Sequence, residues 1–213
     1  MFFQPVEPGF PGLTPFEGFP IAFHGGSLSA IVTTDELGWA VFLHNLTANA
    51  LSNGPVYHVG PVRGVSTEVL KRLVDDVSGL YLARAYSTKD IVQAFNYVED
   101  GSLVVVSGFP LLPDRREDDV LEIRRSVDEK GLIAVLVHHT LEFNELDLPG
   151  EFKRLYILPE LFDSLIVIRA NSYRGHYKLG VTVLKAPPDQ LSARGEHLIS
   201  ADSLVRKIVQ TSK

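Results

Sequence analysis

The 213-residue chain contains no cysteine, which excludes disulfides, thiolate metal sites and a cysteine nucleophile. It has no surplus of positive charge either, because its formal net charge is −6, so no general basic surface attracts nucleic acid or acidic lipids. No apolar stretch approaches the ~18 residues that span a bilayer, and no signal-peptide pattern is found. These absences predict a cytoplasmic protein.

The composition is that of a globular protein, with 45% hydrophobic and 22% charged residues. The single Met and the few Asn and Gln residues resemble a thermophile composition. Residues 1–26 are rich in Phe, Pro and Gly and are predicted to form an irregular arm. Residues 27–213 are predicted to form one domain, since this length suits a single core.

Apolar runs and helical patterns alternate along that domain, which predicts an α/β fold with a mainly parallel sheet flanked by helices. Strands are predicted over Leu28–Val32, Val56–Val59, Leu80–Ala85, Leu103–Val106, Leu132–Val137, Ser164–Ala170 and Tyr177–Lys185. Helices are predicted over Leu37–Ala50, Thr67–Val77, Asp114–Lys130 and Asp202–Gln210, and another helix is predicted to begin at Ser87. The last two strands are predicted to form an antiparallel hairpin around a loop over Asn171–His176.

The junction between the first strand and the first helix has the setting of a phosphate-binding P-loop, whose pattern is G-x-x-x-x-G-K-[ST]. On that pattern the first Gly is replaced by Thr33 and the second is Gly38, while Trp39 and Ala40 replace the Lys and the hydroxyl residue. Trp39 lacks the cation that neutralises phosphates, and Ala40 has no atom to hold magnesium. The junction therefore predicts a degenerate nucleotide site without cofactor.

Carboxylates occupy the same junction. Thr33 and Glu36 have capping-box spacing, and Asp35 is predicted to lie in the first turn of the helix. Asp35 and Glu36 would satisfy the helix N–H groups and repel a triphosphate. The segment is equally consistent with an ordinary capped helix that has no relation to a P-loop.

The segments GFPGL (9–13), GFP (18–20) and GGSLSAI (25–31) resemble the sequence that precedes the P-loop in archaeal RadA and RadB recombinases and KaiC-like ATPases. Further segments are similar in the same order: Phe42–Leu51, Gly54–Tyr57, Leu103–Val106, Leu132–Thr140, Asp163–Ile168 and Val183–Pro187. The resemblance covers nearly the whole chain and implies a RecA-like fold.

The family's catalytic positions are replaced in this chain. The Walker B strand of the family ends in an Asp that organises magnesium, whereas the corresponding strand here ends in Ser107. The family's catalytic Glu follows its second strand, whereas Val59–Arg63 contains no carboxylate, and His139 lies near the position of its sensor Gln. Because phosphoryl transfer needs these groups together, the comparison implies a pseudo-ATPase with no catalytic residues.

We therefore expect an accessory role in DNA recombination or repair through protein contacts, with a recombinase or a second copy as partner. The family docks an amino-terminal Phe on a neighbouring subunit, which marks Phe2, Phe3 and Phe10 as interface candidates. The segment corresponding to one family DNA loop, Leu141–Lys153, is acidic and argues against family-style DNA binding.

The better single-stranded DNA candidate is the predicted hairpin, where aromatic and basic side chains alternate. Its candidate residues are Arg169, Tyr173, Arg174, Tyr177 and Lys178, although an ordinary exposed hairpin tip has the same composition. His138 and His139 should point to opposite faces of a strand and make a poor metal site, so no metal is predicted. The alternative function is another ligand or activity in the vacated cleft, around Asp35, Arg63 and His139.

Overall fold

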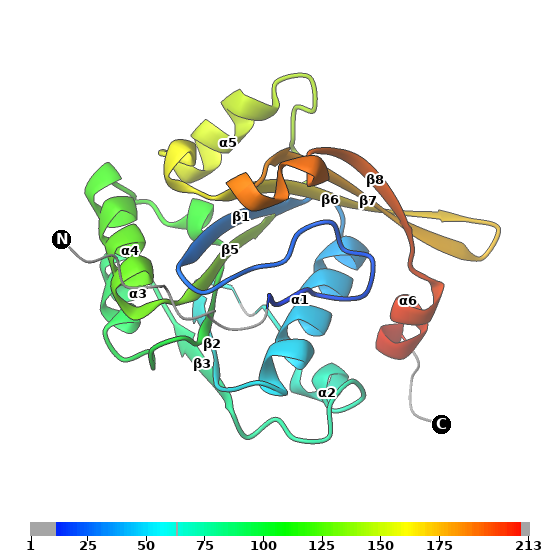
Figure 1. Cartoon of the computed structure of the whole chain (residues 1–213), viewed down its shortest axis with the longest axis horizontal. Coiled ribbons are helices and arrows are strands. Elements are labelled where there is room, and N and C mark those ends of the chain that lie inside the picture. The colour runs from blue at the N-terminus through cyan, green and yellow to red at the C-terminus, as the bar shows by residue number, and fades with distance from the viewer. Residues whose placement is uncertain (1–11, 63, 210–213) are drawn as a thin grey trace.

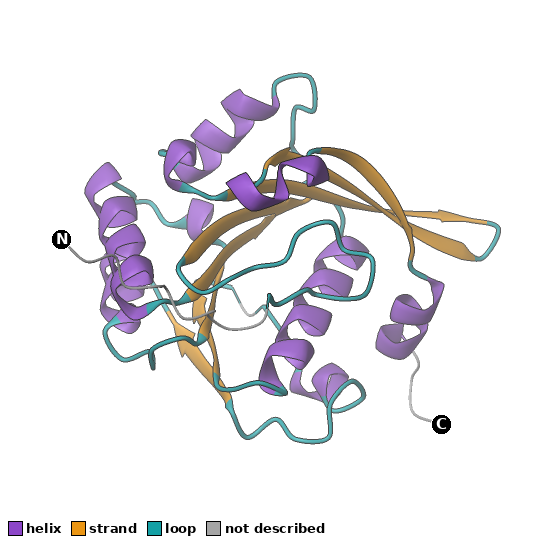
Figure 2. Ribbon diagram, in the orientation of Figure 1, coloured by secondary structure: helices purple, strands orange, loops and turns teal. Residues whose placement is uncertain are grey.

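The computed structural model describes residues 12–62 and 64–209. Its centre is an eight-stranded sheet with the order β3-β2-β4-β5-β1-β6-β7-β8 (Figures 1 and 2). The strands are β1 (Ser27–Thr33), β2 (Val56–Gly60), β3 (Leu80–Arg84), β4 (Leu103–Ser107), β5 (Ile133–His139), β6 (Ser164–Tyr173), β7 (His176–Lys185) and β8 (Gly195–Ser200). Strands β1 to β6 pair in parallel, and β7 and β8 continue the sheet antiparallel. The predicted α/β architecture and carboxy-terminal hairpin are confirmed.

Helices cover both faces of the sheet (Figure 1). Their bounds are α1 (Glu36–Leu51), α2 (Thr67–Leu70), α3 (Thr88–Phe95), α4 (Glu117–Lys130), α5 (Leu148–Tyr156) and α6 (Asp202–Val209). One apolar core lies between the sheet and α1, α2 and α6, and a second lies between the sheet and α3, α4 and α5. Strands β1, β4 and β5 are buried from both sides, which explains their apolar runs.

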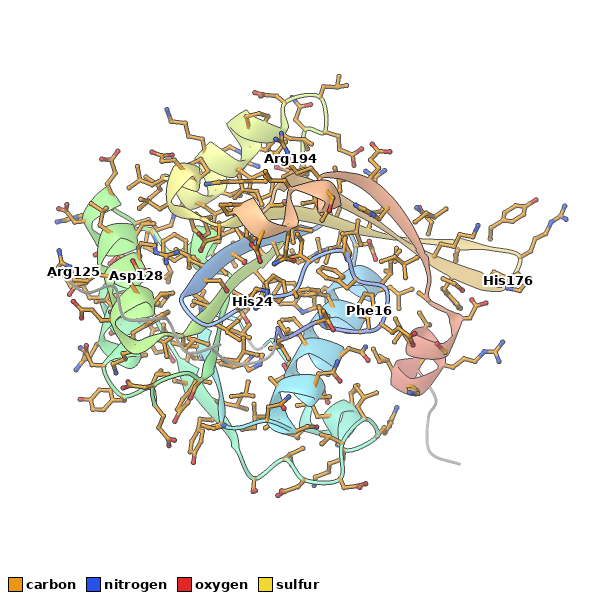
Figure 3. All side chains as sticks on the ribbon, viewed as in Figure 1. Phe16, His24, Arg125, Asp128, His176 and Arg194 are labelled. Carbon is orange, nitrogen blue, oxygen red and sulfur yellow. The ribbon has the colours of Figure 1, made fainter. Side chains whose placement is uncertain are left out.

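Helix α1 is buried around most of its circumference because residues 12–26 pack across it. Phe16, Phe19 and Phe23 belong to the same core as α1, and the rings of Phe19 and Phe42 lie 5.7 Å apart. Figure 3 shows Phe16 close to this helix. The aromatic part of the amino-terminal segment that the structure describes is therefore buried in the chain's own core. Phe2, Phe3 and Phe10 lie outside the described residues.

Several predicted boundaries are wrong. The helix expected over Thr67–Val77 ends at Leu70, and turns follow it. The loop expected over Asn171–His176 is reduced to Arg174 and Gly175, because β6 and β7 extend to a tight turn with positive φ at both residues. Strand β8 and helix α5 were not predicted, and α5 begins inside Leu141–Lys153, the segment that the resemblance matched to a DNA loop of the recombinases.

Candidate functional site

The carboxyl edge of β1 passes almost directly into α1. Strand β1 ends at Thr33 and the helix begins at Glu36, so only Thr34 and Asp35 connect them. Thr33 pairs with both neighbouring strands, and its carbonyl oxygen accepts a hydrogen bond from the Thr140 N–H at 3.0 Å. The positions on which the sequence analysis laid the P-loop pattern are therefore divided between the end of a strand, two connecting residues and the first turns of a helix.

Asp35 is the N-cap of α1. One of its carboxylate oxygens accepts the Gly38 N–H at 2.6 Å, and the other accepts the Ala170 N–H from β6, also at 2.6 Å. The carboxylate thus occupies the positive end of the helix dipole, where anions bind. The predicted capping box is wrong, because Thr33 is a buried strand residue and Glu36 is the first residue of the helix.

A pocket of about 510 Å³ opens at the carboxyl ends of β1, β4 and β5. Its lining residues are Glu36, Trp39, Val62, Gly108, Leu111, His138 and His139. Parallel α/β sheets bind ligands at this edge. Ala40 and Gly38, which the P-loop pattern placed in a nucleotide site, lie in α1 and do not line this pocket.

The imidazole of His139 lies beside Trp39, with ring centroids 6.3 Å apart. Its Nδ1 lies 3.2 Å from the carbonyl oxygen of Thr33, which orients the ring at the pocket wall. His138 also lines this pocket, although its side chain alternates with that of His139 along β5. Burial, reinforced by the nearby charges of His139, Arg154 and Arg115, lowers the pKa of His138 to about 4.

Ser107 and His58 are two further polar residues at the same edge of the sheet, next to the segment that follows β2. Both side chains are buried, and neither Ser107 Oγ nor His58 Nδ1 has a hydrogen-bond partner. His58 Nε2 lies 2.9 Å from Thr47 Oγ1, and burial lowers the pKa of His58 to about 3. Sequence reasoning marked Ser107 but missed His58, because helix α1 supplies its partner.

The hairpin candidates divide into two groups. Tyr173, Arg174 and Lys178 are exposed, and the Arg174 guanidinium lies 5.0 Å from the centroid of the Tyr173 ring. Arg169 lies in mid-strand, where it pairs with Glu145, and Tyr177 packs against the core. Figure 3 shows the neighbouring His176 at the far end of the hairpin. The structure therefore brings three of the five candidates to the projecting tip.

Among residues 12–62 and 64–209, no group of three or more His, Asp and Glu side chains is placed to hold a metal ion. No helix in this described part of the chain is long and apolar enough to cross a membrane. Arg63, one residue of the alternative cleft, lies outside the described residues.

This arrangement defines a RecA-like, KaiC-like α/β fold, with a pocket at the carboxyl edge of a mainly parallel sheet. Among solved structures, the flagellar accessory protein FlaH from Methanocaldococcus jannaschii is similar, with a TM-score of 0.61 and 16% sequence identity. The match covers 83% of this chain and 85% of that chain. No family model and no curated protein sequence matches the chain significantly.

Proposed function

We propose that this chain is a RecA-fold accessory protein that does not hydrolyse ATP and binds a different ligand at the carboxyl edge of its sheet. The observation that carries the proposal is the double hydrogen bond of Asp35 to the Gly38 and Ala170 N–H groups. A triphosphate at this helix terminus would have to displace the carboxylate and would be repelled by its charge. Trp39 and Ala40 supply neither the cation nor the magnesium ligand that ATP chemistry uses.

The pocket beside Trp39 favours a ligand with an aromatic or apolar body and a positive group. Trp39 and Leu111 supply apolar walls, and Glu36 supplies a carboxylate at the opening. An ammonium group gains from both a carboxylate and an aromatic face, whereas a polyphosphate gains from neither. This binding role corresponds to the cleft-based alternative from the sequence.

Tryptophan fluorescence tests the proposal directly, because Trp39 is the only tryptophan in the chain. We expect phenethylamine, an aromatic cation, to change the fluorescence of Trp39 in a saturable way. Mg²⁺·ATP should change it less at equal concentration and should not be hydrolysed above the protein-free rate. Glu36→Gln should weaken phenethylamine binding about tenfold, the scale of one charged contact. Glu122→Gln, an exposed change on α4, is the matched control.

Two outcomes contradict this proposal. The first is steady Mg²⁺·ATP turnover by the purified chain, which shows that the Asp35-capped helix still supports phosphoryl transfer. The second is saturable binding of ATP that is tighter than that of phenethylamine and insensitive to Glu36→Gln.

The accessory role rests on the fold and on the resemblance of the sequence to recombinase relatives. The similar solved structure is a flagellar accessory protein, which favours a role within a protein assembly over independent catalysis. DNA recombination is the setting that the recombinase resemblance proposes, with a recombinase or a second copy as partner. Light scattering of the chain alone and with a purified RadA-type recombinase tests this role. A monomer in both measurements contradicts it.

Single-stranded DNA binding is a second candidate function, supported by the exposed hairpin tip. Arg174 lies over Tyr173, and Lys178 is exposed on the adjacent strand. Stacking aromatics with nearby cations are the usual elements of sequence-independent single-strand binding.

A further inference from the structure

The pocket beside Trp39 contains a hydrogen-bonding atom that the proposed function does not use, the Nε2 nitrogen of His139. His139 ends strand β5 and lines the pocket together with Glu36 and Trp39. Within the described residues, this nitrogen has no hydrogen-bond partner, and it is not one of the fully buried polar atoms. Nε2 therefore borders accessible space, where a molecule in the pocket can contact it.

The backbone of β1 fixes the position of the proton on the His139 ring. Nδ1 lies 3.2 Å from the carbonyl oxygen of Thr33, in hydrogen-bond geometry. A carbonyl oxygen has no proton to donate, so Nδ1 carries the proton of this hydrogen bond. The Thr33 hydroxyl lies 3.4 Å from the same nitrogen and can also accept, so it leaves the assignment unchanged. Because a neutral imidazole has a single N–H, Nε2 of neutral His139 is a hydrogen-bond acceptor.

Trp39 adjoins both this acceptor and the carboxylate of Glu36. Glu36 and Trp39 are three residues apart on α1, so their side chains are neighbours on one helix face. The ring centroids of Trp39 and His139 lie 6.3 Å apart. The pocket wall therefore combines a carboxylate, an aromatic ring and a neutral acceptor.

His138, which also lines the pocket, adds no charge that would repel an ammonium group near neutral pH. Burial is the largest cause that lowers the pKa of His138, to about 4, so its imidazole is uncharged at pH 7.

Two acceptors in one pocket call for two donors on the ligand. An ammonium group suits the carboxylate of Glu36, but an amine without another donor displaces water from His139 Nε2 and leaves that nitrogen unpaired. A site with a polar group placed for a hydroxyl discriminates against the analogue that lacks the hydroxyl. We infer that the Trp39 pocket selects aromatic cations that carry a hydroxyl group, whose O–H donates to Nε2 of His139. The inference rests on the proposed function, because it takes an aromatic cation as the ligand of this pocket.

Calorimetry on the full chain tests this selectivity at pH 8, where an ordinary imidazole is neutral. The probes are phenethylamine, tyramine, the meta isomer of tyramine, and the methyl ethers of both hydroxylated amines, which keep the oxygen but cannot donate. At least one hydroxylated amine should bind about three- to tenfold more tightly than phenethylamine, the scale of one neutral hydrogen bond. Its methyl ether should lose that advantage.

His139→Phe keeps an aromatic ring and removes the acceptor, so it should bring the affinities for the hydroxylated amine and phenethylamine together. His176→Phe is the matched control, because His176 is an exposed histidine at the far end of the hairpin (Figure 3). It should keep the preference of the wild type. NMR of isotope-labelled histidine in the wild type provides a measurement that needs no variant. We expect a proton on Nδ1 of His139, and a shift of the Nε2 signal when the hydroxylated amine binds.

The outcomes separate this inference from the proposed function. If none of the amines binds, the proposed function fails and the inference fails with it. If phenethylamine binds as tightly as both hydroxylated amines, only the inference is overturned. It is also overturned if the preference persists in His139→Phe, if a methyl ether binds as tightly as its parent, or if Nε2 of His139 carries the proton in the free protein.

Discussion

The carboxylate of Asp35 accepts the backbone N–H of Ala170 at 2.6 Å, across 135 residues of sequence. Because the same carboxylate caps α1 through the Gly38 N–H, one side chain fixes the helix terminus to strand β6. A phosphate-binding loop would leave these N–H groups free for a ligand. These two hydrogen bonds make Asp35 the residue that holds the junction between β1 and α1 against β6.

The first prediction concerns stability at this junction. Asp35→Ala removes both an N-cap and the link to β6, and should lower the free energy of unfolding by about 2 to 3 kcal/mol. Asp147→Ala is the matched control, because Asp147 caps α5 through the Gly150 N–H alone, at 3.1 Å. It should cost about 1 kcal/mol. Urea unfolding measures both, and equal losses would show that the Ala170 contact contributes nothing.

The second prediction concerns pH. Burial lowers the pKa of His58 to about 3, whereas the unfolded chain titrates near the ordinary value of 6.5. Between these values the unfolded state binds more protons, so stability is complete above about pH 6.5 and falls as the pH is lowered toward 3. At pH 5 the loss from His58 alone should be about 2 kcal/mol relative to pH 7.

Urea unfolding between pH 4.5 and pH 7 tests this loss. His58→Leu should flatten the pH dependence, because it removes the titrating group. Thr47→Val is the control, since it removes the partner of His58 and keeps the imidazole. It should lower stability at every pH without changing the slope. An unchanged slope in His58→Leu would assign the pH dependence to other groups, among them His138, whose pKa is also lowered to about 4.

The third prediction tests the hairpin. If its tip binds single-stranded DNA, Arg174→Glu should weaken binding of a labelled oligothymidine several-fold and reduce the dependence of binding on salt. Fluorescence anisotropy across a salt series measures both effects. Arg125→Glu is the matched control, because Arg125 is exposed on α4, far from the tip (Figure 3). Equal affinities for wild type and Arg174→Glu would remove the hairpin from consideration.

The fourth prediction concerns the amino-terminal segment. Phe19 is 6% exposed and packs near Phe16, Phe23 and Phe42. Phe19→Ala should therefore lower the free energy of unfolding by about 3 to 4 kcal/mol. Leu146→Ala, at a side chain that is 99% exposed, should change it by less than about 0.5 kcal/mol. A small effect of Phe19→Ala would indicate that residues 12–26 dissociate from α1 in solution.

Much of the sheet could be predicted because its central strands carry their own signal. Leu103–Val106 and Leu132–Val137 are short apolar runs, and the structure buries both between two helical layers. The capping box of Ser87 and Asp90 likewise marks the start of α3 locally, and the structure contains it.

The missed elements lack such local signals. Strand β8 (Gly195–Ser200) lies at the edge of the sheet and is largely exposed, so its sequence shows no apolar run. Helix α5 begins with Leu148, Pro149 and Gly150, which favour a turn when read alone. It is held by burial of Phe152 and Tyr156 against the second core, a contact that the sequence does not display.

The sequence by itself determined that Trp39, Ala40 and Ser107 stand where the P-loop pattern and the recombinase resemblance would expect a Lys, a hydroxyl residue and an Asp, because residue identities do not depend on the fold. Only the tertiary structure decided which contacts these segments make. The Asp35 carboxylate accepts the Ala170 N–H, and His58 and Ser107 line one pocket, because the sheet brings together residues that are distant in the chain. Hydrogen bonding depends on distance and angle in space, and sequence spacing does not specify either across separate strands.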